Sequence, residues 1–480
     1  MTSSINNNKK IVFSYALITL IALLIRFLLL YNKDAWHDEW HTIYVSDPSI
    51  NFGTTLARYW GDKGDTFLTE YYPPLYLFLL KYFFYFFGYT QVVGNIFSII
   101  FGTLTIPLTL YLYQSIYKNN KFYFLGILLI CNLFLLWHSL EIRAHSIVTF
   151  FSILSLILFV KILENSSVLK YVFYFFVSII TITLWPITLT IYFAKCIFIL
   201  KKYFQDKKFY WVLASNLIVI FIFYVALNYQ YLFFNIARET HYTTIYKTFF
   251  INYHFRSFFG SIFAGAAFLL VFSYFALRNA KKIICNNNYS SIIIYTILST
   301  YFLTLLYSTI RAPIMAPKYV IFILPLILIF VSHHVEINKY KTKLKIILSM
   351  IIFSNLLLNY QNYQIKSPPL NRALNIIIEN GGKNIITPEN DVFNNYMLTK
   401  NKFIKNNLSL IDNKDPKSLK KINNFWFLCM NNPSFARGKG SYALPEEARC
   451  KKFDNLSNFK INRFVKIEDF VIKNYLRIPN

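Results

Sequence analysis

The amino-acid sequence predicts an all-α polytopic membrane protein with a small α/β domain at its C-terminal end. Hydrophobic residues make up 56% of the 480 residues and charged residues only 15%, whereas soluble domains average about 45–50% and about 25%. Apolar runs long enough to cross a bilayer recur up to about residue 360. From residue 361 the composition turns polar and rich in Asn and Lys, and short apolar runs alternate with helix-like stretches. We therefore expect a membrane domain at 1–360 and a soluble α/β domain at 361–480.

A membrane-spanning helix needs about 20 apolar residues, and about eleven segments come near this length. These segments are 11–31, 92–116, 121–137, 145–162, 169–185, 187–200, 209–228, 257–277, 290–309, 318–334 and 343–360. The run at 73–88 is short for a span, so we expect it to lie in the membrane interface as an aromatic helix within the first outer loop, 32–91. The first span lacks a small-residue cleavage site and is expected to remain as an anchor.

Lysine and arginine predict the orientation of these spans. If 73–88 does not cross, the basic clusters all fall on one side of the membrane: Lys9-Lys10, Lys118 and Lys121, Lys161 and Lys170, Lys201-Lys202, Lys207-Lys208, Arg278 with Lys281-Lys282, and Lys339 to Lys345. The positive-inside rule makes this side the cytoplasm of an inner-membrane protein, with the acidic loop 32–91 and the C-terminal domain outside. Much of the net charge of +27 is then topological, which argues against a nucleic-acid partner and for contact with membrane lipids.

Two of the five cysteines, Cys429 and Cys450, lie in the tail that the topology puts in an oxidising compartment. We expect them to form a disulfide. The other three, Cys131, Cys196 and Cys285, fall in or beside spans and are expected to be small buried apolar residues.

The most unusual stretch is Trp36-His37-Asp38-Glu39-Trp40-His41, directly after the first span. Two carboxylates among imidazoles and indoles at a membrane edge indicate the catalytic edge of a membrane enzyme. Adjacent residues on a helix point about 100° apart, so one base with a supporting group fits better than a proton-sharing dyad. Asp38 is the predicted base. Glu39 either supports it or is solvated.

The aromatic residues and histidines of this stretch allow two interpretations each. His37 and His41 share one helical face at spacing i, i+4, and with Glu39 or His241 they form a candidate site for a divalent metal. Interfacial histidines are the alternative. Trp36 and Trp40 are interface anchors or a platform for stacking a sugar.

Later outer loops supply cations. The loop 137–145 contains Glu141 and Arg143, which are functional or form an ion pair between helix ends. Arg311 and Lys318 lie beside prolines at the outer surface, where a cation snorkels to water or binds phosphate. The turn at 184–186 has no ionisable group and is interpreted as architectural.

This arrangement suits sugar transfer from a polyprenyl phosphate. A carboxylate must take the proton of the attacking hydroxyl group, cations must stabilise the phosphate that leaves, and a groove must hold the lipid. A lipid-linked sugar flippase or transporter is the alternative, but it usually has ionisable groups near the bilayer midplane. Another membrane transferase, such as an O-antigen ligase or an acyltransferase, would use the same edge.

The order of motifs resembles the GT-C membrane glycosyltransferases, particularly the branch of protein O-mannosyltransferases and the aminoarabinose transferase of lipid A. The matching pieces are Asp38-Glu39 after the first span, Tyr72-Pro73-Pro74-Leu75-Tyr76 where the family has His-Pro-Pro-Leu, Glu141-Ile142-Arg143 before a span, and Pro317-Lys318-Tyr319 with Pro325. The resemblance covers residues 10–335. Tyr72 departs from the family's His, and Asn95 stands near where an Arg often opens the second span.

The resemblance implies a polyprenyl-phosphate-linked sugar donor, inversion at the anomeric carbon, and a lipid, glycan or protein acceptor on the outer face. It makes Asp38 the catalytic aspartate and Glu39 its neighbour. The residues expected at the donor phosphate are Lys318, Arg311 and Arg143, and those expected along the substrate groove are Trp36, Trp40, Tyr72 and Tyr76.

Overall fold

The computed structural model describes residues 2–31, 33–60, 74–203, 210–231, 245, 247–280, 289–310, 314–364, 370–387, 408–411, 422–430, 448–451, 454, 457–467 and 470–478. The chain forms two compact units. One contains residues 1–31, 59–79 and 95–361, and the other contains 32–58, 80–94 and 362–480. The predicted boundary between 360 and 361 stays a prediction.

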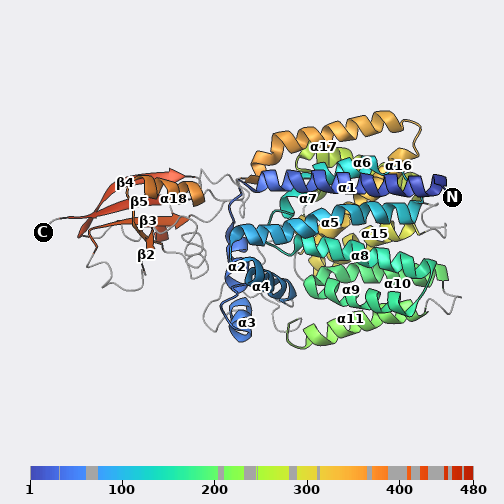
Figure 1. Ribbon diagram of the computed structural model, residues 1–480, viewed down its shortest axis with the longest axis horizontal. Helices are drawn as coiled ribbons and strands as arrows, with labels where there is room; N and C mark the ends of the chain where they lie inside the picture. The colour runs from blue at the N-terminus through green and yellow to red at the C-terminus, as the bar shows by residue number, and fades with distance from the viewer. Residues whose placement is uncertain are drawn as a thin grey trace. The chain divides into compact units, whose positions relative to one another are not determined.

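A bundle of apolar helices makes up the first unit (Figure 1). Its main helices are α1 (Thr2–Leu30), α5 (Gln91–Tyr117), α6 (Tyr123–Cys131), α7 (Leu133–His138), α8 (His145–Glu164), α9 (Val168–Leu184), α10 (Leu189–Tyr203), α11 (Tyr210–Tyr231), α13 (Ile262–Arg278), α15 (Ser291–Ile310), α16 (Leu324–Glu336) and α17 (Lys341–Gln364). Every predicted apolar run falls on these helices and their short helical extensions. Among the described residues, six helices are long and apolar enough to cross a membrane, or seven if one bent pair is a single span.

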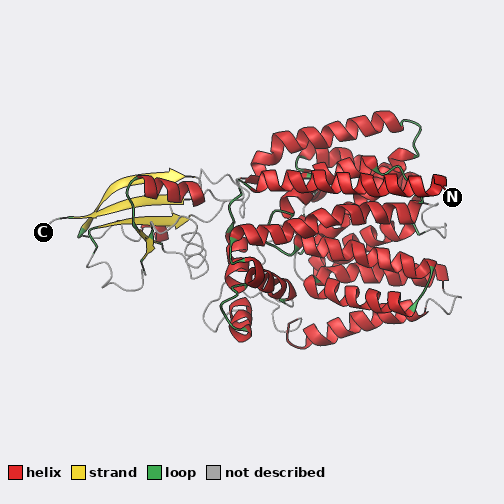
Figure 2. Cartoon of the chain, viewed as in Figure 1, coloured by secondary structure: helices red, strands yellow, loops and turns green. Residues whose placement is uncertain are grey.

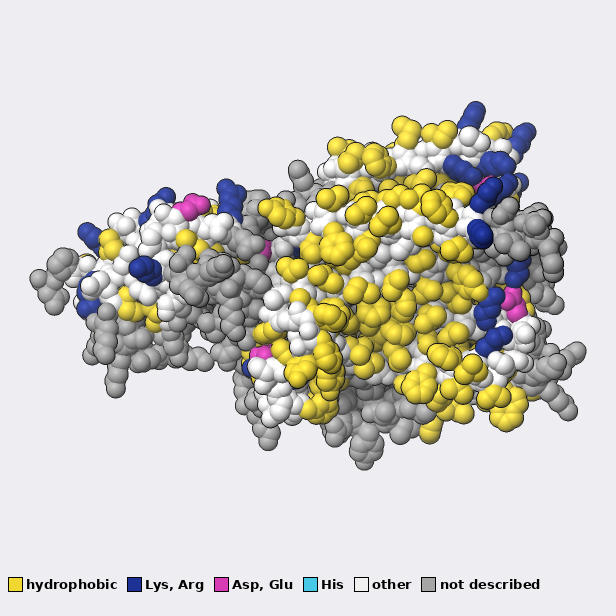
Figure 3. Space-filling model, viewed as in Figure 1, with side chains coloured by type: hydrophobic (Ala, Val, Ile, Leu, Met, Phe, Trp, Pro, Cys, Tyr) yellow, Lys and Arg dark blue, Asp and Glu magenta, His cyan; other side chains and the backbone are white. Residues whose placement is uncertain are grey.

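The side of this bundle is apolar. Exposed residues there include Leu28, Phe263, Leu270 and Leu358, each at least 69% exposed. Figure 3 shows such side chains over the side of the bundle, with Lys and Arg gathered at the end near the N-terminus marked in Figure 1. An apolar belt of this kind needs lipid around it, so the protein is a membrane protein.

Two breaks in the helices shape the end of the bundle that carries α7. Asn132 separates α6 from α7: its Oδ1 accepts from the Leu135 amide at 2.9 Å, and its Nδ2 donates to the Phe258 carbonyl at 2.9 Å. The second break lies between α12 (Arg256–Phe259) and α13, where the chain bends by 97°. Gly260 adopts φ +84° there, a backbone conformation that side chains other than glycine rarely adopt. The Asn355 amide donates to the Phe259 carbonyl beside this turn.

Three short helices lie in the described part of the segment 32–91. They are α2 (His37–Val45), α3 (Phe52–Trp60) and α4 (Leu75–Phe87). The position of α4 agrees with the helix predicted at 73–88. Tyr72, a predicted groove residue, lies outside the described residues.

A mixed five-stranded sheet lies in the C-terminal part of the chain, and Figure 2 distinguishes its strands from the helices. The strands are β1 (Asn384–Ile386), β2 (Ser409–Leu410), β3 (Asn424–Met430), β4 (Phe459–Ile467) and β5 (Phe470–Arg477), in the order β2-β1-β3-β5-β4. β1 pairs in parallel with β2 and β3, whereas β5 pairs antiparallel with β3 and β4. Helix α18 (Leu370–Glu379) precedes the sheet in the chain.

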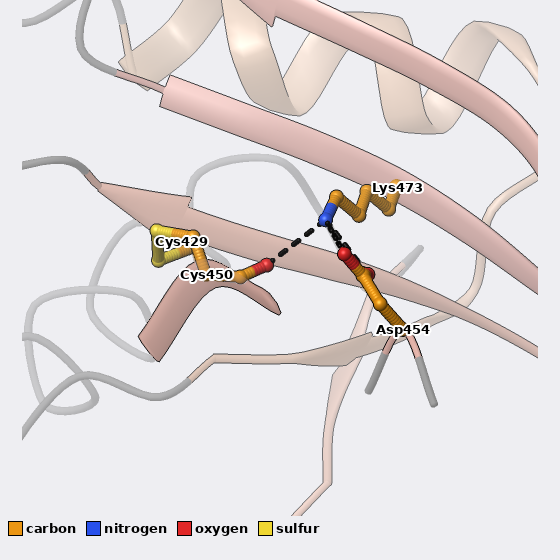
Figure 4. Close-up of a disulfide and its surroundings, with 4 residues drawn as sticks. All are labelled: Cys429, Cys450, Asp454 and Lys473. Carbon is orange, nitrogen blue, oxygen red and sulfur yellow. Dashed lines mark hydrogen bonds and ion pairs between the residues drawn. A yellow bond between two sulfur atoms is a disulfide. The ribbon is translucent and has the colours of Figure 1, made fainter. Parts of the chain in front are cut away.

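The core of this sheet contains the predicted disulfide. Cys429 on β3 bonds to Cys450 on η7 (Ala448–Lys451), which confirms the pairing (Figure 4). The buried Lys473 ammonium lies beside it and donates to Asp454 at 2.7 Å and to the Cys450 carbonyl at 3.1 Å. Tyr475 donates to the same carboxylate at 2.6 Å. The cross-link between residues 21 positions apart contributes about 3 kcal/mol by restricting the unfolded chain.

Candidate functional site

The Asp-Glu pair lies in the first turn of α2. Trp36 is the N-cap residue in an extended conformation, and its amide donates to Glu39 Oε2 at 3.2 Å. A carboxylate three positions into a helix that reaches back to the N-cap amide stabilises the helix start, and negative charge there complements the helix dipole. The sequence therefore starts a helix immediately after Trp36 and fixes the position of Glu39.

Glu39 forms a buried ion pair that the sequence analysis missed. The Lys33 ammonium donates to both carboxylate oxygens at 2.7 Å, and the two side chains are 1% and 0% exposed. The Lys33 carbonyl accepts from Gln91, the first residue of α5, at 2.9 Å. The interpretation of Glu39 as a solvated residue is therefore wrong, because its carboxylate is enclosed with a cation as its partner.

Asp38 differs from its neighbour in burial. It is half-buried, and its backbone carbonyl accepts from the Thr42 hydroxyl at 2.8 Å. Because adjacent helical residues point about 100° apart, Asp38 lies on a different face of α2 from Glu39. Trp40 and His41 are buried and Trp36 is half-buried. His241 and the side chain of His37 lie outside what the structure describes, so the metal site predicted from them stays a prediction.

Ion pairs and hydrogen bonds brace α2, α3 and α4 against one another. The Arg58 guanidinium lies 3.5 Å from Asp47 and 3.9 Å from the centre of the Tyr44 ring. Lys81 on α4 donates to the Thr55 hydroxyl at 2.8 Å. Burial lowers the pKa of Lys81, while the Asp47 charge acts to raise it. These contacts connect α3 to α2, the helix that carries Asp38, and connect α4 to α3.

A second cluster of ionisable residues lies between α7 and α8. The Glu141 carboxylate accepts from Trp137 Nε1 at 2.8 Å and lies 2.6 Å from His138 Nδ1. The His138 and His145 rings are 4.8 Å apart between centroids. All four residues are at least 97% buried. Such enclosure of a carboxylate and two imidazoles is costly and usually functional at a membrane edge.

Two of the predicted phosphate-binding cations lie near this cluster. The charges of Arg143 and Lys318 both act on His145. Lys318 lies on η4 (Pro317–Ile323), with its ammonium 5.5 Å from the Tyr319 ring centre. Both cations are half-buried. Arg311, the third predicted cation, lies outside the described residues.

Trp185 connects the two elements that carry this cluster. Its indole nitrogen donates to the Tyr319 carbonyl at 2.9 Å, and its ring lies 5.9 Å from the His145 ring. The turn at 184–186 thus joins two neighbouring elements, and its interpretation as purely architectural stays a prediction. His138, Glu141 and His145 fall within one short segment, and this density of ligand-type side chains was the signal that could have identified the two histidines.

The same three residues are the candidate metal ligands of the described chain. Each offers one ligand atom, and these atoms lie within 4.8 Å of one another. Two imidazoles and one carboxylate match the donor set of catalytic zinc sites, in which Zn–N bonds are about 2.0–2.1 Å long. The residue types therefore fit a divalent metal, although the cluster has to contract around the ion.

No sequence-family model and no curated protein matches this chain. Among solved structures, ArnT from Cupriavidus metallidurans in the apo state matches with a TM-score of 0.56 and 9% identity, over 96% of this chain and 97% of ArnT. The chain has the fold of ArnT. The ArnT structure bound to undecaprenyl phosphate matches over the same shares of both chains, with a TM-score of 0.53 and 10% identity. An Archaeoglobus fulgidus oligosaccharyltransferase matches with a TM-score of 0.43 and 11% identity, over 87% of this chain and 67% of its own.

The likeness to ArnT confirms the fold that the sequence motifs implied. Because it covers 96% of this chain, it includes residues of the C-terminal sheet as well as the helical bundle. At 9–10% identity it is a likeness of fold, so the roles of individual residues rest on the geometry described above.

The Lys33–Glu39 pair generates a stability prediction. Lys33→Met leaves a buried, unpaired carboxylate and should lower the free energy of unfolding by about 3–5 kcal/mol. The double variant Lys33→Met/Glu39→Met removes both charges and should be markedly more stable than the single variant. Thermal unfolding of the detergent-solubilised protein measures both.

The matched control for this pair is Lys118→Met, which breaks an ion pair with Glu164 in which the lysine side chain is 65% exposed. An exposed pair is worth about 1 kcal/mol or less. Equal losses of unfolding free energy in Lys33→Met and Lys118→Met would contradict the prediction that the buried ion pair stabilises the protein more than the exposed one.

Proposed function

We propose that this protein is an integral-membrane, inverting glycosyltransferase that moves a sugar from a polyprenyl-phosphate donor to an acceptor on the outer face of the membrane. The observation that carries the proposal is the placement of Arg143 and Lys318 beside one buried cluster in a lipid-surrounded bundle with the ArnT fold. ArnT has been solved bound to undecaprenyl phosphate, a ligand with an apolar tail and an anionic head.

In the proposed reaction, Asp38 is the general base. Its carboxylate accepts the proton of the acceptor hydroxyl while that oxygen attacks the anomeric carbon from the face opposite the phosphate. The bond between the anomeric carbon and the phosphate oxygen breaks, and the electron pair stays on that oxygen. One displacement of this kind inverts the anomeric centre. Prenyl phosphate is a weak base, so no general acid is required.

Arg143 and Lys318 stabilise the negative charge that grows on the phosphate, and we assign the same role to Arg311. Fixed cations at the position where charge develops lower the barrier without reorganisation. We also assign the groove to Trp36, Trp40, Tyr72 and Tyr76. Tyr76 is buried, with its ring 5.9 Å from Phe97 on α5.

The ligand atoms of His138, Glu141 and His145 favour a second role, the binding of a metal ion. We propose that these residues hold a divalent metal, which when bound supplies a Lewis-acid charge close to the phosphate-binding cations. His37, His41 and His241 are the alternative ligands. The acceptor is a lipid, glycan or protein hydroxyl.

The general-base role generates a prediction for Asp38→Asn. The amide cannot take the proton, so transfer from a radiolabelled prenyl-phosphate sugar should fall by about 10²–10⁴-fold. Donor binding and protein level should stay unchanged. The control is Asp65→Asn, another acidic residue of the segment 32–91. If Asp38→Asn transferred the sugar as fast as this control, Asp38 would not be the general base.

The phosphate role generates a prediction for Lys318→Gln. Loss of a charge-assisted hydrogen bond costs about 1.5–3 kcal/mol, so the KM for the donor should rise by about 10- to 150-fold. Lys318→Arg should recover part of the loss. Lys339→Gln, an exposed lysine between α16 and α17, is the control. An unchanged donor KM for Lys318→Gln would contradict the role.

The metal proposal is tested by equilibrium binding of Zn²⁺ to the purified, chelator-treated protein. The wild type should bind about one equivalent. His145→Ala should lose this binding because it removes one of three ligands, whereas His41→Ala should keep it. The reverse pattern would favour the ligands predicted from the first loop, and no saturable binding by the wild type would overturn both assignments.

A further inference from the structure

Arg26 is a buried cation that the proposed reaction does not use. It lies one turn before the end of α1 and is 1% exposed. Its Nε donates to the Ser139 hydroxyl at 2.8 Å, and its Nη1 donates to the Ala22 carbonyl at 3.0 Å. Within the described part of the chain no carboxylate pairs with it. Among these residues, the guanidinium is therefore enclosed without a counter-ion.

Among the described residues, some N–H groups of Arg26 have no acceptor. A guanidinium carries five N–H groups, and the two hydrogen bonds of Arg26 occupy two of them. A buried charge without a partner costs several kcal/mol. An anion that accepts from the remaining N–H groups removes most of this cost, and phosphate fits the planar fork of arginine in a bidentate manner.

The surroundings of Arg26 are polar and tightly packed. Ser139 accepts from Arg26 and donates to the Leu136 carbonyl at 2.6 Å, so its hydroxyl fixes the guanidinium in place. On α5, Gly102 packs against Ser139 so closely that a Cβ would lie 2.3 Å from the serine Cβ. Ser139 also belongs to the loop 137–145 that carries Glu141 and Arg143.

The α5 face that packs on this loop carries further unused polar groups. Asn95 Nδ2 donates to the Leu140 carbonyl at 2.5 Å, and Ser98 lies between Asn95 and Gly102 at helical spacing. The buried Asn95 Oδ1 and Ser98 Oγ have no hydrogen-bond partner among the described residues. The α5 face that packs on the loop of Ser139 thus holds one hydroxyl group and one amide oxygen without a partner among the described residues.

We propose that Arg26, positioned by Ser139 and assisted by Ser98, forms a buried anion subsite that takes a phosphoryl oxygen of a lipid-linked phosphate. The inference rests on the proposed function and adds a third binding element, α1, to η4 and the loop 137–145. Leu24 and Leu28, on the opposite face of α1 from Arg26, are 53% and 76% exposed, so the helix that carries the cation borders the apolar belt of the bundle. The acceptor atom Asn95 Oδ1 suits a hydroxyl on the same ligand.

The experiment measures dissociation constants for the purified full chain with three probes: undecaprenyl phosphate, the uncharged undecaprenol and inorganic phosphate. We expect the wild type to bind undecaprenyl phosphate more tightly than either other probe. Arg26→Met should weaken this binding by about 10- to 150-fold, because a charge-assisted hydrogen bond is lost. Arg26→Lys should recover part of it. Lys10→Met, an exposed cation near the other end of α1, is the matched control.

Ser98→Ala keeps the test decisive if Arg26→Met fails to fold, since removing an unpartnered buried hydroxyl does not destabilise the protein. Ser98→Ala should weaken undecaprenyl phosphate about tenfold. The subsite would be overturned if Arg26→Met, or both Arg26→Lys and Ser98→Ala, bound undecaprenyl phosphate with wild-type affinity. This result would leave the glycosyltransferase proposal intact. Arg26-dependent binding of inorganic phosphate without any binding of undecaprenyl phosphate would overturn both. Asp38→Asn should bind like the wild type.

Discussion

A lipid bilayer offers no hydrogen-bond partner to the peptide group, and this constraint governs where the chain can be irregular. At the breaks beside Asn132 and Gly260, a side-chain amide donates to a backbone carbonyl. Asn132 bridges the start of α7 to the Phe258 carbonyl, and Asn355 does the same for the Phe259 carbonyl beside Gly260. With these carbonyls satisfied, α7 can end at the edge of the bundle and leave the short loop 137–145 to carry Glu141 and its histidines.

The same constraint explains Lys195, a cation buried in the middle of α10. Its ammonium donates to the Ser155 hydroxyl at 2.6 Å and lies 4.3 Å and 4.7 Å from the ring centres of Tyr192 and Tyr174. Hydrogen bonding and cation–π contact thus enclose it between α8, α9 and α10. An ionisable group therefore also lies inside the bundle. The preference for an enzyme over a flippase had relied on ionisable groups being rare in the middle of the spans. The contacts of Lys195 nevertheless join three helices. Arg26, by contrast, has N–H groups without an acceptor among the described residues.

The helices were predictable because their signal is local: twenty apolar residues in a row need no partner to be recognised. The short helix α4 and the Cys429–Cys450 disulfide were also predicted from the sequence. Contacts between distant segments were not predictable. Trp185 meets Tyr319 across 134 positions, and no pattern in either segment announces the other. Lys33 is only six positions from Glu39, yet their pairing depends on the extended conformation at Trp36.

The adjacent carboxylates show how burial assigns separate roles to two similar groups. Glu39 is 0% exposed, with both oxygens held by Lys33, so it cannot exchange a proton without leaving a lysine charge unpaired in the interior. Asp38 is half-buried and lies on another face of the same turn. A general base must gain and lose a proton in every turnover, whereas a positioning group must do neither. We therefore propose that the chemistry falls to Asp38, and that the Lys33–Glu39 ion pair keeps the helix that carries it in one position.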